Sequence, residues 1–407
     1  MNKIKGSQNG DSNHIKPSSN TAFQLLLFVG LLTAISWNST VSEYLRKTSL
    51  DYILLFRSSY ANKYLDFTMN LCSNLADKYG IALLFWISNV ILSPIRGQIL
   101  ISTACLSISM NIVVKMMVRD ARPYFYTADY VPVSCDFEYG TPSGHAQSST
   151  SFYLTFVAML IKEYDIKKNK SLIYTSWVCL WFFLSFTRIF VGLHTLDQIV
   201  SGLGFGITMH LLLAHVCYDK MYELFEAAGN GKARFFNWLS ILNIILNLVW
   251  IALYFMIDQY YPAPQSWLDT INKSCSHTGR FVTLQYACLA KQFLTWGSIG
   301  AFIGIYCKGK LIIKNDDVNS DKNCVKDSVK LDQENSCKSN KSLKKTAMHV
   351  IINILLGAVW SIPMILVPRT APAPIALFWR SLFPTLSVGF CIVFFFERIR
   401  KLIDKLF

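Results

Sequence analysis

The stretch EYGTPSGHAQSST, residues 138–150, is small, polar and glycine-bearing, and it lies between two hydrophobic runs of the chain. Its PSGH core falls at the start of a predicted helix, where free backbone N–H groups point outward and favour an anion. Ser143 offers a hydroxyl, Gly144 lets a ligand approach the backbone closely, and His145 can exchange a proton near neutral pH. Pro and Ser are also ordinary helix-start residues. The stretch alone therefore leaves an anion site and a plain helix cap both open.

The hydrophobic runs continue along the whole chain. Of its 407 residues, 52% are hydrophobic and 16% are charged, which is too apolar for a soluble domain of this length. Apolar windows of about 17 to 25 residues predict membrane-spanning helices. We place ten of them, at 22–38, 79–95, 99–117, 146–162, 172–190, 196–217, 238–257, 290–307, 347–367 and 375–396. The predicted fold class is all-α, a polytopic membrane helical bundle.

The chain divides into three parts on this reading. A cytoplasmic tail, 1–21, precedes a six-helix core, 22–217, and about four additional helices occupy the C-terminal part, 218–407. The first span resembles a signal sequence in its basic flank, but it has no obvious small-residue cleavage site, so we interpret it as an anchor. Within the last part, the segment 308–346 mixes charges of both signs with Ser and Asn and is predicted to be a disordered cytoplasmic loop.

Basic residues gather on one side of the predicted membrane. The loops that share a side with the N-terminus are rich in Lys and Arg, whereas the opposite loops carry few. Positively charged loops stay cytoplasmic, so topology explains the formal net charge of +14, and we predict no nucleic-acid partner. His210 and His215 fall toward the cytoplasmic end of their span, where we interpret them as interfacial residues.

The non-cytoplasmic side holds the glycosylation sequons and three cysteines. Asn38 and Asn272 begin N-x-Ser/Thr sequons there. Cys72, Cys135 and Cys275 fall on the same side and can pair in an oxidising lumen. No CxxC or Cys/His metal spacing occurs in the sequence, and we predict neither a metal nor a cofactor.

Two further blocks place ionisable residues at helix ends. In KMMVRDARP, residues 115–123, Lys115 and Arg122 are two helical turns apart and project from one face. In FTRIFVGLHTLDQIVSG, residues 186–202, Arg188 ends one helix and His194 precedes the next. Each block alone is compatible with basic residues that reach the membrane interface or complement a helix dipole.

The three blocks together favour a different interpretation. All of them fall at helix ends on the same non-cytoplasmic side, and they supply a lysine, two arginines, a serine, a glycine amide and two histidines. This set suits phosphoryl transfer, in which catalysis consists of positioning and of stabilising charge on the phosphoryl oxygens. Arginine binds phosphate through its planar fork, one histidine can attack phosphorus, and the other can protonate the departing oxygen.

The ordered set K-x6-RP, PSGH and R-x5-H resembles the type 2 phosphatidic acid phosphatase family, which also includes glucose-6-phosphatases and vanadium haloperoxidases. The resemblance covers blocks 115–123, 142–145 and 187–198 within the six-helix core, 22–217. It implies that His194 is the nucleophile and His145 the general acid. It also implies a set of phosphate-binding residues: Lys115, Arg122, Ser143, Gly144 and Arg188.

Two positions depart from the family pattern. Thr187 stands where the third block usually begins with Ser, which keeps the hydroxyl. The acid usually found four residues after the nucleophile is replaced by Gln198, while Asp197 lies three residues after it. Since i+3 and i+4 both neighbour His194 on a helix, Asp197 is a candidate catalytic residue that can still hold the imidazole in its tautomer. The sequence leaves open whether Asp197 or Gln198 orients His194.

The resemblance leaves the substrate open. Glucose-6-phosphatases also carry Gln at that fourth position, whereas lipid-phosphate members of the family have compatible helix numbers. We therefore expect a lipid phosphate or a sugar phosphate as substrate, membrane lipids as neighbours, and a location in the endoplasmic reticulum or another endomembrane. The alternative is a non-catalytic transporter or scaffold with a degenerate site, which the intact basic residues and histidines disfavour.

Overall fold

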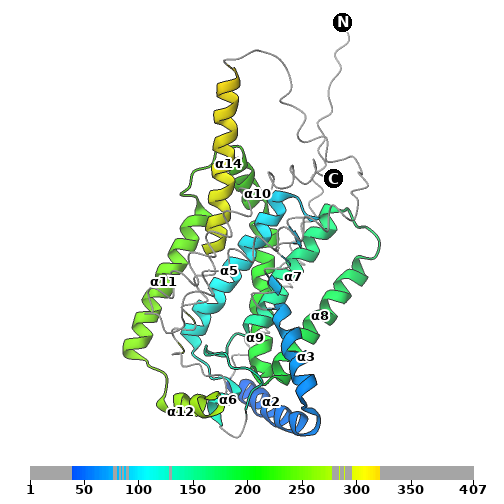
Figure 1. Cartoon of the computed structure of the whole chain (residues 1–407), viewed down its shortest axis with the longest axis vertical. Coiled ribbons are helices and arrows are strands. Elements are labelled where there is room, and N and C mark those ends of the chain that lie inside the picture. Colours follow the sequence, from blue (N-terminus) through cyan, green and yellow to red (C-terminus); the bar gives the residue numbers. More distant parts are fainter. Residues whose placement is uncertain are drawn as a thin grey trace.

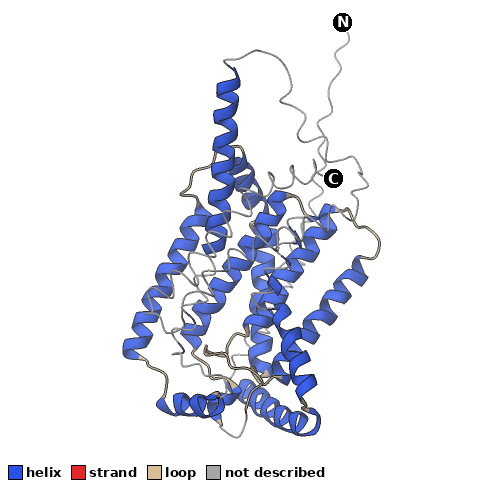
Figure 2. Cartoon of the chain, viewed as in Figure 1, coloured by secondary structure: helices blue, strands red, loops and turns tan. Residues whose placement is uncertain are grey.

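A computed structural model describes residues 39–76, 91–127, 131–276 and 296–320, and isolated positions 80, 81, 84, 87, 88, 284 and 288. Within these residues every regular element is a helix and none is a strand (Figure 2), which confirms the predicted all-α bundle. The helices are α2 (Ser39–Tyr60), α3 (Lys63–Ser73), η1 (Asn74–Ala76), α5 (Pro94–Val118), α6 (Pro123–Tyr126), α7 (Gly144–Glu163), α8 (Lys170–Phe190), α9 (Leu196–Leu211), η2 (Leu212–Val216), α10 (Tyr218–Gly229), α11 (Trp238–Tyr260), α12 (Gln265–Ser274) and α14 (Trp296–Ser320).

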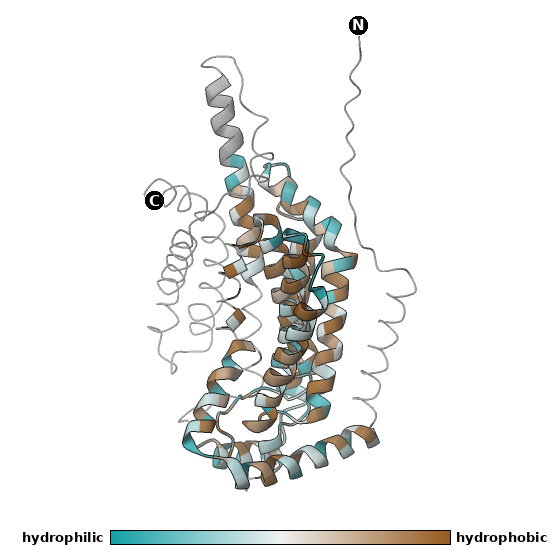
Figure 3. Cartoon of the chain, turned by 90° about the vertical axis from the view of Figure 1, so that its right-hand side faces the viewer, coloured by the Kyte–Doolittle hydropathy of each residue, from teal (hydrophilic) through white to brown (hydrophobic). Residues whose placement is uncertain are grey.

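Within the described ranges, four segments are long and apolar enough to span a membrane: Ile95–Tyr126, Lys170–Phe190, Leu196–Val216 and Trp238–Tyr260. They coincide with four predicted spans, and hydrophobic residues predominate along the middle of the bundle (Figure 3). The predicted span 146–162 is also helical, within α7, and so is the described part of the predicted span 290–307, residues 296–307 of α14, but neither belongs to this set. The predicted spans 22–38, 347–367 and 375–396 lie outside the described residues, and 79–95 lies mostly outside them.

Helix α7 lies at the centre of the core, against α5, α8 and α9 (Figure 1). Its closest approach is to α9, through two glycines. A Cβ atom at Gly202 would lie 2.6 Å from the backbone oxygen of Ser143, and one at Gly206 would lie 2.5 Å from Cβ of Thr150. Small residues at a helix interface let two backbones come together. As a result, the first turn of α7 is held against the first turn of α9.

Helix α2 lies across one end of the bundle, at the bottom of Figure 1, where α5 and α8 end and α7 and α9 begin. The predicted membrane spans leave the segment between 38 and 79 unassigned. Its inward face packs through apolar and aromatic contacts, with Ile53 buried and Phe56 edge-on to Phe186 and Phe190. Polar residues on the same face reach toward the ends of the core helices, as described below.

The C-terminal part contacts this same end through α12. Trp267 of α12 lies against Phe125 of α6, with ring centroids 5.9 Å apart. A disulfide joins Cys135 to Cys275, which follows α12. The expectation that cysteines on this side pair is thus confirmed for two of the three, and Cys72 keeps a free thiol.

The boundary of the predicted cytoplasmic loop differs from the structure. Helix α14 continues to Ser320, so the first part of the segment 308–346 is helical. The sequence from 308 to 320 contains no proline to stop the helix that enters it, and its only glycine, Gly309, is followed by Leu and Ile residues. Residues 321–346 lie outside the described residues.

Candidate active site

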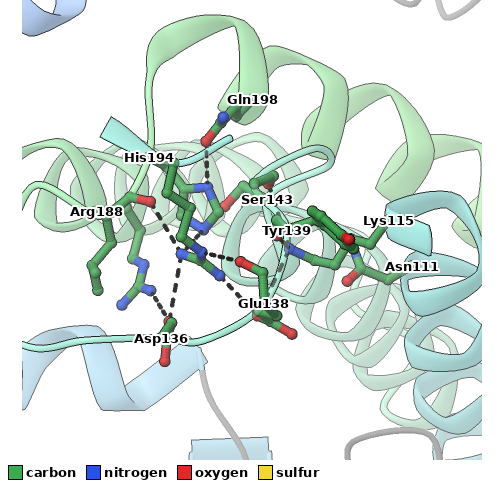
Figure 4. A network of polar contacts seen from close by, with 12 residues as sticks. Asn111, Lys115, Asp136, Glu138, Tyr139, Ser143, Arg188, His194 and Gln198 are labelled. Carbon is green, nitrogen blue, oxygen red and sulfur yellow. Dashed lines mark hydrogen bonds and ion pairs between the residues drawn. The ribbon is translucent and has the colours of Figure 1, made fainter. Parts of the chain in front are cut away.

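The three sequence blocks meet at the end of the bundle that α2 covers (Figure 4). Lys115 comes from the last turn of α5, Ser143 caps α7, Arg188 lies in the last turn of α8, and His194 lies in the short connection to α9. The members of the set are all buried: Lys115, Arg122, Ser143, His145, Arg188 and His194. Segments far apart in the sequence therefore place their cations and histidines in one protein interior.

The first block is shaped by the end of α5. The helix stops at Arg119, whose φ of 53° is left-handed, and the chain re-enters a helix at Pro123. Lys115 Nζ donates hydrogen bonds to the carbonyls of Tyr139 and Gly140. Arg122 donates from Nε to the Glu138 carbonyl, at 2.7 Å. Both cations are thereby fixed against the loop that leads into the second block.

The second block forms the start of α7. The Ser143 hydroxyl accepts a hydrogen bond from the Ala146 N–H, and the Ser143 N–H donates to the Gln198 carbonyl at 2.9 Å. Asn111 of α5 donates to the Pro142 carbonyl, at 3.2 Å. A Cβ atom at Gly144 would lie 3.4 Å from Asn111 Oδ1, so the backbone there is closely approached. His145 follows in the first turn of α7.

The third block places His194 between two partners. Its Nε2 lies 3.1 Å from Arg122 Nη1, and its Nδ1 lies 2.9 Å from Gln198 Oε1. Burial lowers the pKa of His194 well below the usual 6.5 of histidine, and the three nearby cations lower it further. The ring is therefore neutral at physiological pH, which a nucleophilic nitrogen requires.

Of the two candidates, the side chain that contacts the His194 imidazole is Gln198 and not Asp197. Asp197 Oδ2 accepts a hydrogen bond from the Ser42 hydroxyl of α2, at 2.9 Å, and lies 3.8 Å from Arg46 Nη2. Both i+3 and i+4 adjoin His194 on a helix, so spacing alone did not decide between them. The packing of α9 against α7 turns the i+4 side chain to the imidazole and the i+3 side chain to α2.

Two carboxylates in the site were missed by sequence reasoning. Asp136 Oδ2 lies 2.8 Å from Arg188 Nη2 and 3.6 Å from Arg122 Nη1. Glu138 Oε1 lies 2.9 Å from Arg122 Nη2 and 3.7 Å from Lys115 Nζ. Both precede the PSGH stretch in a loop without periodicity, and no motif marks them. Each of the three cations of the site is therefore paired with at least one of these two carboxylates.

Among the described residues, no group of three or more His, Cys, Asp or Glu side chains is arranged to hold a metal ion. Positive charge in this site is carried by the Lys and Arg side chains.

One stretch of the chain matches a known protein family. Residues 97–222 match the family model of the PAP2 superfamily. Two curated relatives are a dolichyldiphosphatase of Saccharomyces cerevisiae, 26% identical over 38% of this chain and 59% of that protein, and phosphatidylglycerophosphatase B of Bacillus subtilis, 22% identical over 26% of this chain and 49% of that protein. The chain thus spans about half to three fifths of the length of these relatives.

A solved structure is also similar to this chain. It is a transmembrane PAP2-type phosphatidylglycerolphosphate phosphatase from Bacillus subtilis, 18% identical, which covers 49% of this chain and 96% of its own, with a TM-score of 0.40.

Proposed function

We propose that this protein is a metal-independent phosphatase of a membrane, which hydrolyses a phosphate ester of a lipid through a phosphohistidine. The observation that carries the proposal is the placement of His194. Its Nδ1 is held by Gln198, its Nε2 faces the guanidinium of Arg122, and its ring is neutral. A neutral imidazole with one oriented lone pair, buried among three cations, is suited to attack a phosphoryl group.

The reaction proceeds in two displacements. His194 Nε2 attacks phosphorus, a P–N bond forms, and the bond from phosphorus to the ester oxygen breaks while His145 gives that oxygen a proton. Water then attacks the phosphohistidine and gives a proton to His145. The P–N bond breaks, inorganic phosphate leaves, and His194 returns to its neutral form. Atoms and protons balance over the cycle.

The cations stabilise the charge on the phosphoryl oxygens during both displacements. Arg122 and Arg188 offer planar forks, Lys115 offers a point charge, and the first turn of α7 offers backbone N–H groups. In this role they supply what divalent cations supply in many phosphotransferases. Binding of the substrate requires the contacts of Asp136 and Glu138 to these cations to be exchanged for contacts to phosphate.

A lipid substrate is favoured over a sugar phosphate. By their names, the two curated relatives act on dolichyl diphosphate and on phosphatidylglycerophosphate, which are both lipid phosphates. The site also lies at the ends of segments long enough to span a membrane, where the phosphate of an embedded lipid is at the right depth.

The catalytic end is proposed to face the lumen of the endoplasmic reticulum or another endomembrane compartment. The disulfide between Cys135 and Cys275 lies at this end, and disulfides persist in oxidising compartments. Asn272 of the INKS sequon is exposed on α12 at the same end. If the orientation holds, Asn272 carries a glycan that an endoglycosidase removes, and Asn272→Gln abolishes the associated mobility shift. A native chain without any shift at Asn272 would argue for the opposite orientation.

The activity is tested by phosphate release from purified protein in detergent. The panel comprises phosphatidylglycerophosphate, phosphatidate, sphingosine 1-phosphate, a prenyl diphosphate and glucose 6-phosphate, each with and without a chelator. We expect release from one or more lipid phosphates, retained in the chelator and inhibited by vanadate, which adopts the five-coordinate geometry of the transferring group. A requirement for added divalent metal would overturn the mechanism, and preference for glucose 6-phosphate would overturn the substrate class.

The covalent step is tested by acid or alkali quench after addition of a ³²P-labelled substrate. A phosphohistidine is labile to acid and stable to alkali, so label on the native protein should survive only the alkaline quench. His194→Ala should carry no label and release no phosphate. Hydrolysis by that variant at the native rate would remove His194 from the reaction, and no hydrolysis of any substrate by the native protein would favour a non-catalytic role.

A further inference from the structure

The side chain that holds His194 is itself held by an aspartate outside the recognised motifs. Gln198 Nε2 donates to Asp120 Oδ2 at 2.8 Å and to the Ala121 carbonyl at 2.7 Å. The whole side chain of Gln198 is buried, and a Cβ atom at Gly140 would lie 2.3 Å from its Nε2. The glutamine therefore occupies a fitted space between the α5–α6 connection and the imidazole.

These contacts decide which way the glutamine amide points. An amide has an oxygen and an NH₂ of similar size, and it can turn over in place. Both partners on the far side of Gln198, a carboxylate oxygen and a backbone carbonyl, only accept hydrogen bonds. The NH₂ must face them, so Oε1 faces His194 Nδ1. An amide oxygen only accepts, which places the imidazole proton on Nδ1 and the lone pair on Nε2.

Asp120 is anchored on its other sides as well. Its Oδ2 accepts from the Thr141 hydroxyl at 2.6 Å, and its Oδ1 lies 3.3 Å from Arg46 Nη2 of α2. Its backbone carbonyl accepts from the Gly140 N–H at 2.8 Å. Asp120 thus joins the end of α5, the loop before α7 and the covering helix α2. It occupies one of the six unspecified positions between Lys115 and Arg122 in the K-x6-RP block.

We propose that Asp120 is a positioning residue of the reaction, which acts through Gln198 to keep the proton of His194 on Nδ1 and the attacking lone pair on Nε2. This inference rests on the proposed function. It assigns to a glutamine and a distant carboxylate together the task that a single acid performs beside the histidine of other enzymes. The carboxylate does not touch the imidazole and carries no proton away during the cycle.

Asp120→Asn tests the proposal with little change in shape. An asparagine offers one acceptor oxygen where the carboxylate offered two, and its NH₂ can face Gln198. The glutamine amide then turns over in part of the population, presents its NH₂ to Nδ1, and moves the imidazole proton to Nε2. We expect the rate constant of phosphoenzyme formation to fall by about 10- to 100-fold with KM unchanged. This loss is smaller than the roughly 10⁴-fold loss for a removed triad acid, because the Ala121 carbonyl still favours the native orientation of the amide.

The double variant Asp120→Asn/Gln198→Glu separates positioning from mere structure. The carboxylate introduced at 198 accepts the Nδ1 proton whichever way it turns, and the asparagine NH₂ can donate to it. Its phosphoenzyme formation should recover to within about 10-fold of the native rate. Gln198→Glu alone sets two carboxylates side by side and should stay slow. Equal loss in Asp120→Asn and in the double variant would overturn the proposal.

The matched control is Asp66→Asn. Asp66 is also an aspartate at the catalytic end paired with an arginine of α2, Arg57, at 3.0 Å, but it lies outside the site. It should leave kcat unchanged. A native protein without phosphatase activity would refute the proposed function itself. An active native protein in which Asp120→Asn matches Asp66→Asn would refute only the role of Asp120.

Discussion

Histidines lie at both ends of α9, with His194 just before the helix and His210 in its last turn, and the two ends differ in what surrounds the rings. At the catalytic end, His194 has a guanidinium at one nitrogen and an oriented amide at the other. At the opposite end, His210 Nδ1 lies 2.9 Å from the Thr155 hydroxyl, and His215 Nε2 lies 3.3 Å from His210 Nε2. A buried histidine is a candidate nucleophile when its neighbours fix which ring nitrogen carries the proton, as the Arg122 guanidinium and the Gln198 amide oxygen do for His194. A hydroxyl and a second imidazole can each donate or accept, so the contacts of His210 do not fix its tautomer.

The largest effect is expected from Arg122→Ala. Arg122 contacts His194, the proposed nucleophile, and removing one preorganised charge stabiliser typically costs about 100- to 1,000-fold in kcat. The matched control is Arg96→Ala, because Arg96 is equally ion-paired, with Glu163, but at the opposite end of the bundle. Steady-state phosphate release by both variants measures the contrast. Comparable losses in the two would mean that the guanidinium of Arg122 acts only through folding.

The pH dependence of kcat/KM should separate His194 from an ordinary histidine. Only the neutral ring attacks, so activity is lost as pH falls through the pKa of His194. Because burial holds the pKa of His194 well below 6.5, the acid limb of kcat/KM, which reports the free enzyme, should lie below pH 6.5. The measurement is a rate profile from pH 4.5 to 8 at low substrate. An acid limb above pH 6.5 would contradict a ring buried among cations.

The smallest effect on catalysis is expected from His210→Ala. His210, which its place in the sequence predicts to lie near the membrane interface, is buried within the protein and packs against Thr155 of α7. Its loss removes a buried contact and should lower the free energy of unfolding by about 1–3 kcal/mol without changing kcat. Denaturant unfolding in detergent and phosphate release report the two quantities. A loss of kcat as large as that of Arg122→Ala would mean that the two ends of the bundle do not differ in their importance for catalysis.

Much of the candidate site could be predicted because ionisable residues at the ends of predicted helices can be recognised in the sequence. An ionisable side chain at a membrane rim is costly, so its occurrence in three ordered blocks indicated a site. The structure brings Lys115, Arg122 and Arg188 together at the end where the blocks were expected to converge. Apolar windows likewise predicted the four spanning segments, because burial in a bilayer demands their length and composition.

The remaining features of the site depend on the rotation of α9 about its axis and on the path of an irregular loop. Hydrophobic periodicity in the sequence encodes neither. Whether Asp197 or Gln198 meets His194 depends on how α9 is turned, and the glycines that let it approach α7 decide that turn. The carboxylates of Asp136 and Glu138 reach the cations from an irregular loop. Helix α2 was missed because its apolar residues are interrupted by polar ones that contact the core, such as Ser42.

The disulfide between Cys135 and Cys275 also sets the earliest moment during synthesis at which the two parts of the site can be covalently joined. The two cysteines are 140 residues apart in the sequence, and the first lies directly beside Asp136. At ribosomal speeds of about 5–20 residues per second, roughly 7 to 28 s separate their synthesis. During that interval the loop that carries Asp136 has no covalent link to the C-terminal part of the chain. The end of the bundle that holds His194 is therefore joined to α12 only after both α11 and α12 have been synthesised.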